Sequence, residues 1–302
     1  MKAYGSILPF VFAAFLNWAA DALHVSSYGA GIRSRNITAE RRKPVIWLHL
    51  HKSAGTLMCS LAKQQDEQII QPEKTCNLEP PVIKVDGVGE MGLRQHRLSC
   101  QERKALYSSQ GATWGQIERE YNLEDIDCKD SFLYGIMVRN PMSLMLSDLN
   151  FNHWDADNLT SWLQEGKANP DAVCGNRCEH TGWPTLGWQL FDNFAVRSLN
   201  GYEVWTKPPG HITSEDLEQA KRHLEKMDVV MVVEDLSQDK VQLEQVFGWS
   251  DIPLDAVNEH DHEANFTETQ WTFLNELNAF DYALYEFGRG IAKQRDRQYS
   301  PS

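Results

Sequence analysis

The stretch Val45-Ile-Trp-Leu-His-Leu-His-Lys-Ser-Ala-Gly-Thr56 decides the fold class. Residues 45–50 form a continuous, mostly apolar run, which is typical of a strand buried on both faces of a sheet. A short polar loop follows, and a helical segment extends from Thr56 to about Lys63. A strand, a loop and a helix in this order are the repeating unit of a parallel sheet covered by helices.

A second unit of the same kind occurs further along the chain. The apolar strand Phe132–Val138 leads through Arg139-Asn-Pro141 into a helix at 142–149, and Pro141 stands where a first helical turn accepts proline. The run 228–233 predicts another strand. We therefore expect an α/β fold with a P-loop-like parallel sheet and helices on both faces. Its ligand should bind at the carboxyl ends of the strands.

Capping signals place three further helices. Residues 186–200 predict a helix closed by Gly201. Thr213, with Asp216 in the capping-box position, predicts a helix through Glu225. A last long helix is expected from Thr267 onward, because apolar residues recur there at mostly helical spacing.

Length and charge limit the function classes. A chain of 302 residues fits one catalytic domain, which we place at 44–296. Its formal net charge of −13 disfavours nucleic acid and anionic lipid as partners. An anionic ligand therefore requires a local cluster of positive groups.

The N-terminus predicts entry into the secretory pathway. Lys2, the apolar stretch 7–20 and the small-x-small sequence Ala20-Asp-Ala22 favour a signal peptide or a short membrane anchor over residues 1–22, with a buried helix as the alternative. Residues 23–43 are polar and basic and suggest a stem or linker. Three N-x-Thr sequons and six cysteines agree with this route. We expect the Golgi lumen or membrane, or secretion.

The cysteines and one acidic stretch allow predictions about disulfide bonds and metal binding. Cys174 and Cys178 are spaced for a small disulfide loop, and Cys59 is predicted to be a small apolar filler in a buried helix. The stretch Glu259-His-Asp-His-Glu263 is interpreted as a solvated loop, and no metal is expected.

The loop after the first strand has the chemistry of an anion site. Ala54 and Gly55 let the backbone approach a ligand at the start of a helix, where N–H groups and the helix dipole favour negative charge. Lys52 adds a full charge and Thr56 a hydroxyl donor. The lysine precedes the glycine, unlike the kinase-type G-x4-G-K-[ST] loop. The alternative is an ordinary crossover with an exposed lysine.

Residues 48–56 resemble the 5′-phosphosulfate loop of Golgi carbohydrate sulfotransferases, especially the heparan sulfate 2-O and 6-O group, with the pattern H-x-P-K-T-G-G-T. His51 and Ala54 depart from the proline and the first glycine of that pattern. The resemblance implies that the loop binds the sulfuryl donor 3′-phosphoadenosine 5′-phosphosulfate (PAPS). Its candidate ligands are His51, Lys52, Ser53, Ala54, Gly55 and Thr56.

Other segments are similar to the same family. Residues 139–147 resemble its 3′-phosphate loop R-D-P-x-x-R-x-x-S, which implies that Arg139 and Ser147 bind the 3′-phosphate, although Asn140 and Leu144 depart from the pattern. The alternative for Arg139 is a structural role, in which it forms an ion pair at the end of a strand. Residues 192–197 resemble the N-x-Q-T-R helix, which adds Arg197 as a candidate ligand. Segments 229–234 and 277–285 resemble the strand ending in glutamate and the closing L-N-x-x-D-x-x-L-Y helix.

The resemblance implies sulfuryl transfer from PAPS to a hydroxyl of a carbohydrate or another hydroxylated acceptor. Lys52 would stabilise the charge of the leaving group. The base is open, because residues 111–114 look like the family segment that a histidine precedes, but with glycine at the position of the histidine. Glu118 is the first candidate, followed by Glu120 and His96, and each has an ion-paired or surface role as its alternative.

The acceptor side is defined only in outline. Tryptophans at positions 154, 162, 183 and 188 are candidates for stacking on sugar rings or, equally, for core anchors. The acidic chain favours a neutral or lightly charged glycan or a small hydroxylated metabolite. Two rival functions remain: a nucleotide-dependent kinase, and a secreted glycan-binding protein on a degenerate sulfotransferase fold.

Overall fold

The structure of the protein is a computed structural model, and the chain divides into two units, residues 1–41 and 42–302, of which only the second contains described residues. The predicted leader and nearly all of the predicted stem lie outside the described residues. In the part of the chain that is described, no helix is both long and apolar enough to cross a membrane. The described residues are 42–71, 74–78, 83–85, 89–91, 98–118, 120–121, 128–152, 155–173, 187–254 and 266–300.

A parallel sheet lies at the centre of the second unit. Its strand order is β4 (Trp114–Ile117), β1 (Val45–Leu48), β5 (Leu133–Val138) and β6 (Val229–Val232), and every pairing is parallel. The three strands expected from apolar runs are thus confirmed, and all four strands are buried along almost their whole length. The α/β prediction is correct at this level.

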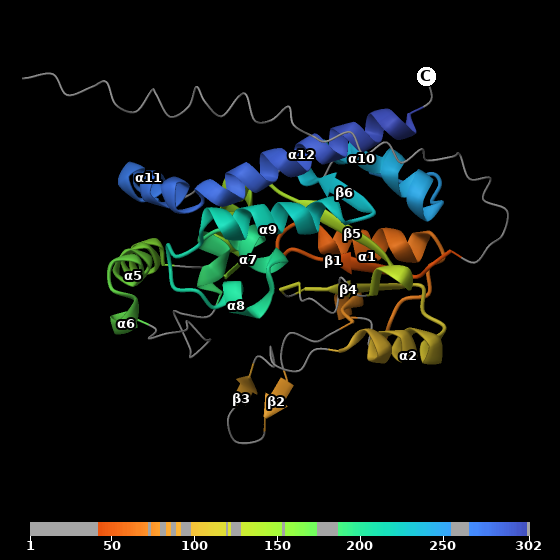
Figure 1. The fold of residues 1–302 in the computed structure, drawn as a ribbon, viewed down its shortest axis with the longest axis horizontal. Coiled ribbons are helices and arrows are strands. Elements are labelled where there is room, and N and C mark those ends of the chain that lie inside the picture. Colours follow the sequence, from red (N-terminus) through yellow and green to blue (C-terminus); the bar gives the residue numbers. More distant parts are fainter. Residues whose placement is uncertain are drawn as a thin grey trace, which may run out of the picture. The chain divides into compact units, whose positions relative to one another are not determined.

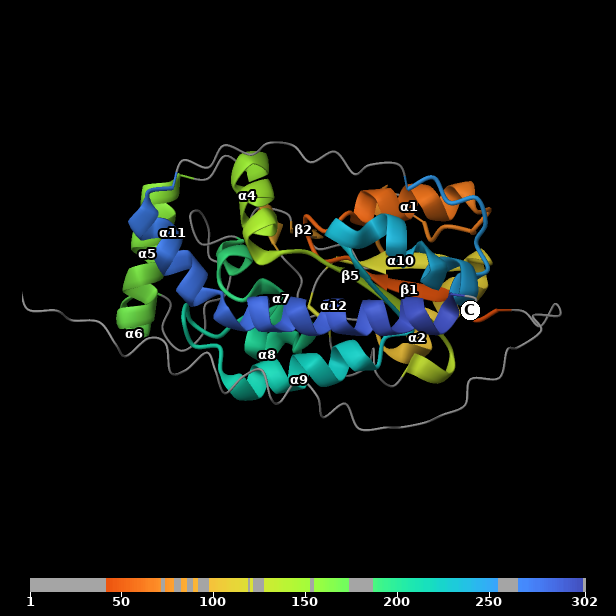
Figure 2. The same cartoon turned by 90° about the horizontal axis from the view of Figure 1, so that it is seen from above.

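The two faces of the sheet carry separate cores. Ile46 and Leu48 pack into one hydrophobic cluster, whereas Val45 and Trp47 pack into the other, as the alternation of a strand requires. The first cluster includes residues of α9 (Ser214–Glu225) and α12 (Ala279–Tyr299), and the second includes residues of α1 (Gly55–Gln64) and α10 (Leu236–Gln242). Figure 2 shows α1 and α9 on opposite sides of the sheet. Helices therefore cover both faces.

The remaining elements surround this sandwich (Figure 1). A two-stranded antiparallel sheet pairs β2 with β3, and short 3-10 or π-helical turns cover 74–76, 128–130, 188–191, 233–235 and 243–247. The bounds are β2 (Ile83–Val85), β3 (Gly89–Met91), α2 (Cys100–Gln110), α4 (Pro141–Asn152), α5 (Ala156–Ala168), α6 (Pro170–Val173), α7 (Phe194–Leu199), α8 (Gly201–Trp205) and α11 (Glu268–Leu277).

Two of the predicted helices are each interrupted at an asparagine, Asn193 in one and Asn278 in the other. The helix expected over 186–200 is a 3-10 turn followed by α7, because Asn193 has a left-handed φ of 50°, and Gly201 begins α8 instead of closing a helix. The long helix expected from Thr267 is two helices divided at Asn278. Asn193 donates to the carbonyl of Leu277, and Asn278 accepts from the backbone N–H of Asn193. The two breaks therefore stabilise each other.

Other local predictions are confirmed. Thr213 and Asp216 form the expected capping box of α9, and Thr267 forms a capping box with Gln270 at the start of α11. Pro141 is the first residue of α4.

The cysteines form bonds that the sequence did not predict. Cys59 pairs with Cys76, and Cys100 pairs with Cys128. The interpretation of Cys59 as a simple apolar filler is therefore wrong, although the residue is buried in α1. Cys174, Cys178 and the stretch 259–263 lie outside the described residues.

Candidate functional site

The loop between β1 and α1 has a constrained backbone. Lys52 and Ala54 have φ values of 60° and 57°, in the left-handed region that non-glycine residues rarely adopt. Ala54 is the N-cap of α1, so a glycine of the family pattern is replaced here by a residue that bears this conformation with strain. The first N–H groups of α1 have no partner within the helix, and the loop offers them to an anion.

The glycine that follows is required by the packing of a histidine. A Cβ atom added to Gly55 would lie 2.0 Å from the His49 ring. His49 is itself buried, and burial lowers the pKa of its imidazole. This close packing explains why His49 and Gly55 both keep the residue types of the family pattern.

Arg139 joins the second predicted loop to the first. It stands directly after β5, the neighbour of β1, and its Nη1 donates to the carbonyl oxygen of Lys52 over 2.7 Å. Its Nε is buried and has no hydrogen-bond partner among the described residues. Burial lowers the pKa of the guanidinium, although Glu234 opposes that effect. The guanidinium therefore keeps donor capacity for an anion at this edge of the sheet.

The loop that carries Arg139 is fixed from two sides. The backbone N–H of Asn140 donates to Glu234, in the 3-10 turn that follows β6, and the Tyr285 hydroxyl of α12 donates to the other oxygen of that carboxylate. The Asn140 side chain accepts from the N–H groups of Met142 and Ser143 and so caps α4. Asparagine performs this capping as well as aspartate does, which accounts for one departure from the family pattern.

Glu118 lies at the same edge, directly after β4. Its Oε1 accepts a hydrogen bond from Nδ1 of His51 at 2.8 Å, and its Oε2 accepts one from Asn77 at 3.0 Å. Nε2 of His51 lies 3.2 Å from Oδ1 of Asp148, a buried residue of α4. His51 thus bridges two carboxylates, an arrangement that needs a proton on both ring nitrogens.

The charges of this cluster follow from its geometry. Burial lowers the pKa of His51, but its hydrogen bonds to Asp148 and Glu118 outweigh burial and raise that pKa to about 9. Burial raises the pKa of Glu118, but the hydrogen bonds from His51 and Asn77 and the nearby histidine charges lower it to about 2. At neutral pH the imidazole is therefore a cation and Glu118 an anion.

Lys52 completes the cluster. Burial and the neighbouring Arg139 charge lower the pKa of its ammonium, and Asp148 partly opposes them. The Nζ atom lies 3.8 Å from the centroid of the Phe151 ring. Lys52, Arg139 and His51 form the local group of cations that an anionic ligand of this acidic protein would require.

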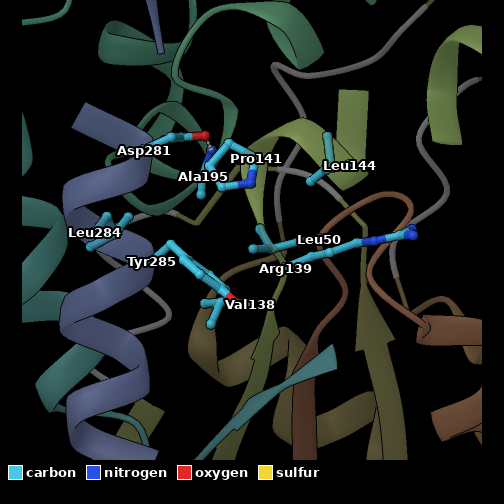
Figure 3. Close-up of a pocket in the computed structure, with 9 residues that line it drawn as sticks. All are labelled: Leu50, Val138, Arg139, Pro141, Leu144, Ala195, Asp281, Leu284 and Tyr285. Atoms are coloured by element: carbon cyan, nitrogen blue, oxygen red, sulfur yellow. Dashed lines mark hydrogen bonds between the residues drawn. The ribbon is translucent and has the colours of Figure 1, made fainter. Parts of the chain in front are cut away.

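A small hollow lies beside Arg139. Figure 3 shows the Arg139 side chain reaching from the end of β5 away from Asp281 and Tyr285, which line the other side. Asp281 is buried and accepts from the N–H groups of Ala195 and Val196, and burial raises its pKa to about 7. The remaining lining residues are Leu50, Val138, Pro141, Leu144, Ala195 and Leu284.

The structure brings most predicted loop residues together. Thr56 is exposed in the first turn of α1, Ser147 is half-buried in α4, and the buried Ser53 hydroxyl has no hydrogen-bond partner among the described residues. Glu120 is fully buried, which gives an acceptor hydroxyl no access to its carboxylate, so only Glu118 of the two predicted glutamates remains as a base. His96 lies outside the described residues.

The prediction that Arg197 binds the nucleotide is wrong. Its side chain has no exposed surface and forms an ion pair with Asp192 at 2.6 Å. Its nitrogens also donate to the carbonyl oxygens of residues 192, 204, 205, 207 and 208. Because a guanidinium has only five N–H groups, none is left for a ligand.

Of the two alternatives for the tryptophans, the core anchor is confirmed for Trp188. Trp188 is fully buried, packs against the half-buried Trp162 and lies under the Arg197 guanidinium, so it is a core residue. Trp154 and Trp183 lie outside the described residues. The sequence interpretation missed Asn77, Asp148 and Phe151. The only local signal for the last two was their spacing from Leu144, which puts all three on one face of α4.

Comparisons with known proteins do not extend this description: no protein-family model matches the chain, and no curated protein matches it.

Proposed function

We propose that the protein is a PAPS-dependent sulfotransferase that transfers a sulfuryl group to a hydroxyl of a carbohydrate or a small hydroxylated acceptor. One observation carries this proposal above the others: Arg139 donates to the carbonyl of Lys52, so the two loops that resemble the phosphate loops of the family adjoin. The half-buried Arg139 guanidinium, whose Nε has no hydrogen-bond partner among the described residues, fits a ligand rich in acceptor oxygens.

The donor is held by groups of complementary charge. The N–H groups at the start of α1, Lys52 and Thr56 would bind the 5′-phosphosulfate, and Arg139 and Ser147 the 3′-phosphate. PAPS supplies an activated sulfuryl group. Transfer forms a bond from the acceptor oxygen to sulfur, breaks the bond from sulfur to the bridging phosphate oxygen, and releases the 3′,5′-bisphosphate (PAP) and one proton.

Lys52 and Glu118 have the charges for the two ends of this reaction. The Lys52 ammonium stabilises the negative charge that develops on the leaving phosphate oxygen. Glu118 accepts the proton of the acceptor hydroxyl, because each of its oxygens keeps a lone pair after accepting from His51 or Asn77. Because general-base efficiency follows basicity, a carboxylate of such low pKa is a weak base, and the proton moves only as the acceptor oxygen bonds to sulfur and the hydroxyl becomes acidic.

A lumenal location forms part of the proposal. It rests on the leader-like sequence 1–22 and the sequons, of which Asn158 is exposed in the first turn of α5. The Cys59–Cys76 and Cys100–Cys128 disulfides agree with an oxidising compartment.

Transfer from labelled PAPS to a panel of glycans and small alcohols, with products identified by mass spectrometry, tests the function. Lys52→Ala should reduce turnover about 100-fold or more, because the charge on the leaving oxygen loses its partner. Its melting temperature should change little. Lys167→Ala is the matched control, since Lys167 is an exposed lysine that also lies over an aromatic ring.

The other outcomes separate the rivals. Normal turnover of Lys52→Ala removes Lys52 from the mechanism. Tight binding of ATP with weak binding of PAP points to the kinase. Glycan binding without transfer to any acceptor points to a binding protein on a degenerate enzyme fold, and contradicts the proposal.

A further inference from the structure

An aromatic ring stands exposed beside the proposed catalytic groups. The Phe151 side chain is 63% exposed, in the last turn of α4. Isolated apolar side chains are common on protein surfaces, so exposure alone indicates no function. What points to a function is the set of residues that the Phe151 ring contacts.

Phe151 contacts the phosphate loop through two of its residues. The Lys52 Nζ lies 3.8 Å from the ring centroid, and the His51 ring meets Phe151 edge-on with centroids 6.2 Å apart. Asp148, one turn earlier on α4, is one of the two carboxylates that bind His51. The same helix face therefore supplies the anchor of His51 and an exposed ring next to it.

We propose that Phe151 is the platform on which a cyclic acceptor, a pyranose ring, stacks during sulfuryl transfer. This inference rests on the proposed function and adds the side of the site from which the acceptor approaches. A pyranose has one face of C–H groups, which gains from burial against an aromatic ring, while its hydroxyls remain free for Glu118. Phe151 thus takes the role that the sequence suggested for the tryptophans.

The position of Lys52 adds a coupling between the two substrates. The ammonium lies 3.8 Å from the centroid of the Phe151 ring, and no hydrogen bond joins it to a described residue. A charge-assisted hydrogen bond to a phosphosulfate oxygen is stronger than a cation–π contact at a partly exposed site. Donor binding therefore draws Lys52 off the ring and uncovers it, so PAP should tighten acceptor binding, and the acceptor should tighten PAP binding by the same factor.

Phe151→Ala tests the platform with two acceptors of different shape. We expect the KM for a methyl glycopyranoside to rise about tenfold, whereas the KM for glycerol, which has no ring to stack, changes less than about twofold. Phe151→Tyr keeps the ring and should restore the pyranoside KM. Phe273→Ala is the matched control, because Phe273 of α11 is the ring that lies near Lys167.

Each outcome has one meaning. If the wild type transfers sulfuryl to neither these acceptors nor the wider panel, the proposed function fails. If the wild type is active and Phe151→Ala raises both KM values equally, or raises the pyranoside KM no more than Phe273→Ala does, the platform alone is overturned. A pyranoside affinity that is the same with and without saturating PAP overturns the coupling.

Discussion

Arg139 and Arg197 occupy opposite environments in the same domain. Arg139 follows β5 and is half-buried, with one hydrogen bond to the Lys52 carbonyl and a buried Nε that has no partner among the described residues. Arg197 lies inside α7 without exposed surface, and its donors are satisfied by Asp192 and backbone carbonyls. Both were predicted to bind the nucleotide because their segments resemble two different patterns of one family.

The difference shows that the surroundings of an arginine decide its role. A buried guanidinium whose donors are all satisfied joins segments of the fold, and its removal leaves a buried carboxylate and several carbonyls without partners. A guanidinium with spare donors at a strand end is available to an anion. Substitutions at the two positions should therefore affect different measurements.

The largest effect is expected inside the domain. Arg197→Met should lower the free energy of unfolding by about 3–5 kcal/mol, because Asp192 stays buried without its counter-charge. Urea denaturation measures this loss, and Arg139→Met, expected to lose less than about 1 kcal/mol, is the control. Asp192→Asn serves as a milder second variant if Arg197→Met does not fold. If wild type and Arg197→Met have the same free energy of unfolding, the proposed difference between the roles of Arg197 and Arg139 is wrong.

A smaller effect is expected at the site. Arg139→Ala should lose about 2–4 kcal/mol of PAP affinity, because a charged and partly buried contact to the 3′-phosphate is removed. Adenosine 5′-phosphosulfate lacks that phosphate, so its weak binding should barely change. Calorimetry with both nucleotides measures the difference. Equal losses for the two ligands would return Arg139 to a structural role in an ion pair.

Glu118 and Asp239 are carboxylates whose pKa values shift in opposite directions, so the site and the interior also differ in how they respond to pH. Glu118 at the site is ionised, whereas burial and the neighbouring Asp296 carboxylate raise the pKa of Asp239 in α10. Folded Asp239 thus holds a proton that the unfolded chain releases above about pH 4. Its contribution to stability is complete below that pH and is lost as pH rises through the raised pKa, by at most about 1.4 kcal/mol per pH unit.

Asp239→Asn should remove this dependence. The amide oxygen can still accept from the Val232 N–H, and the amide nitrogen can donate to Asp296 without a proton being taken up. The stability of the variant relative to wild type should therefore increase from pH 5 to pH 8, as measured by urea denaturation across that range. Parallel curves for the two proteins would contradict the assignment.

The sequence predicted what depends on neighbours along the chain. Apolar runs identified β1, β5 and β6, and the residues that follow β1 and β5 include Lys52 and Arg139, which meet because parallel strands end at one edge. Glu118 follows β4, a strand that the sequence did not predict, and it was named only as a carboxylate near residues 111–114. The broken helices were not predictable in this way. Asn193 and Asn278 are 85 residues apart, and their hydrogen bond exists only after the chain has folded.

The contacts of Asp148, Phe151 and Arg197 could not be predicted for the same reason, because they form between segments that are distant in the sequence. Asp148 and Phe151 lie on a face of α4 that a local pattern assigns to packing, and their contacts with His51 and Lys52 depend on how α4 lies against the loop after β1. Arg197 was misassigned because its pattern matches the family while its acceptors come from α8 and the residues after it. Sequence position alone does not show whether a donor is already used.

The Cys59–Cys76 disulfide has a consequence for how the protein must be made. Asn77, the next residue, donates to Glu118, so the bridge fixes to α1 the segment that orients the proposed base. Closing a loop of this size stabilises a domain by about 3 kcal/mol. We expect a chain synthesised in a reducing bacterial cytosol, without this bridge, to hold Asn77 less firmly against Glu118 and to be less active than the oxidised protein. Folding in the periplasm, or refolding with a thiol–disulfide buffer, is therefore part of any valid measurement of its activity.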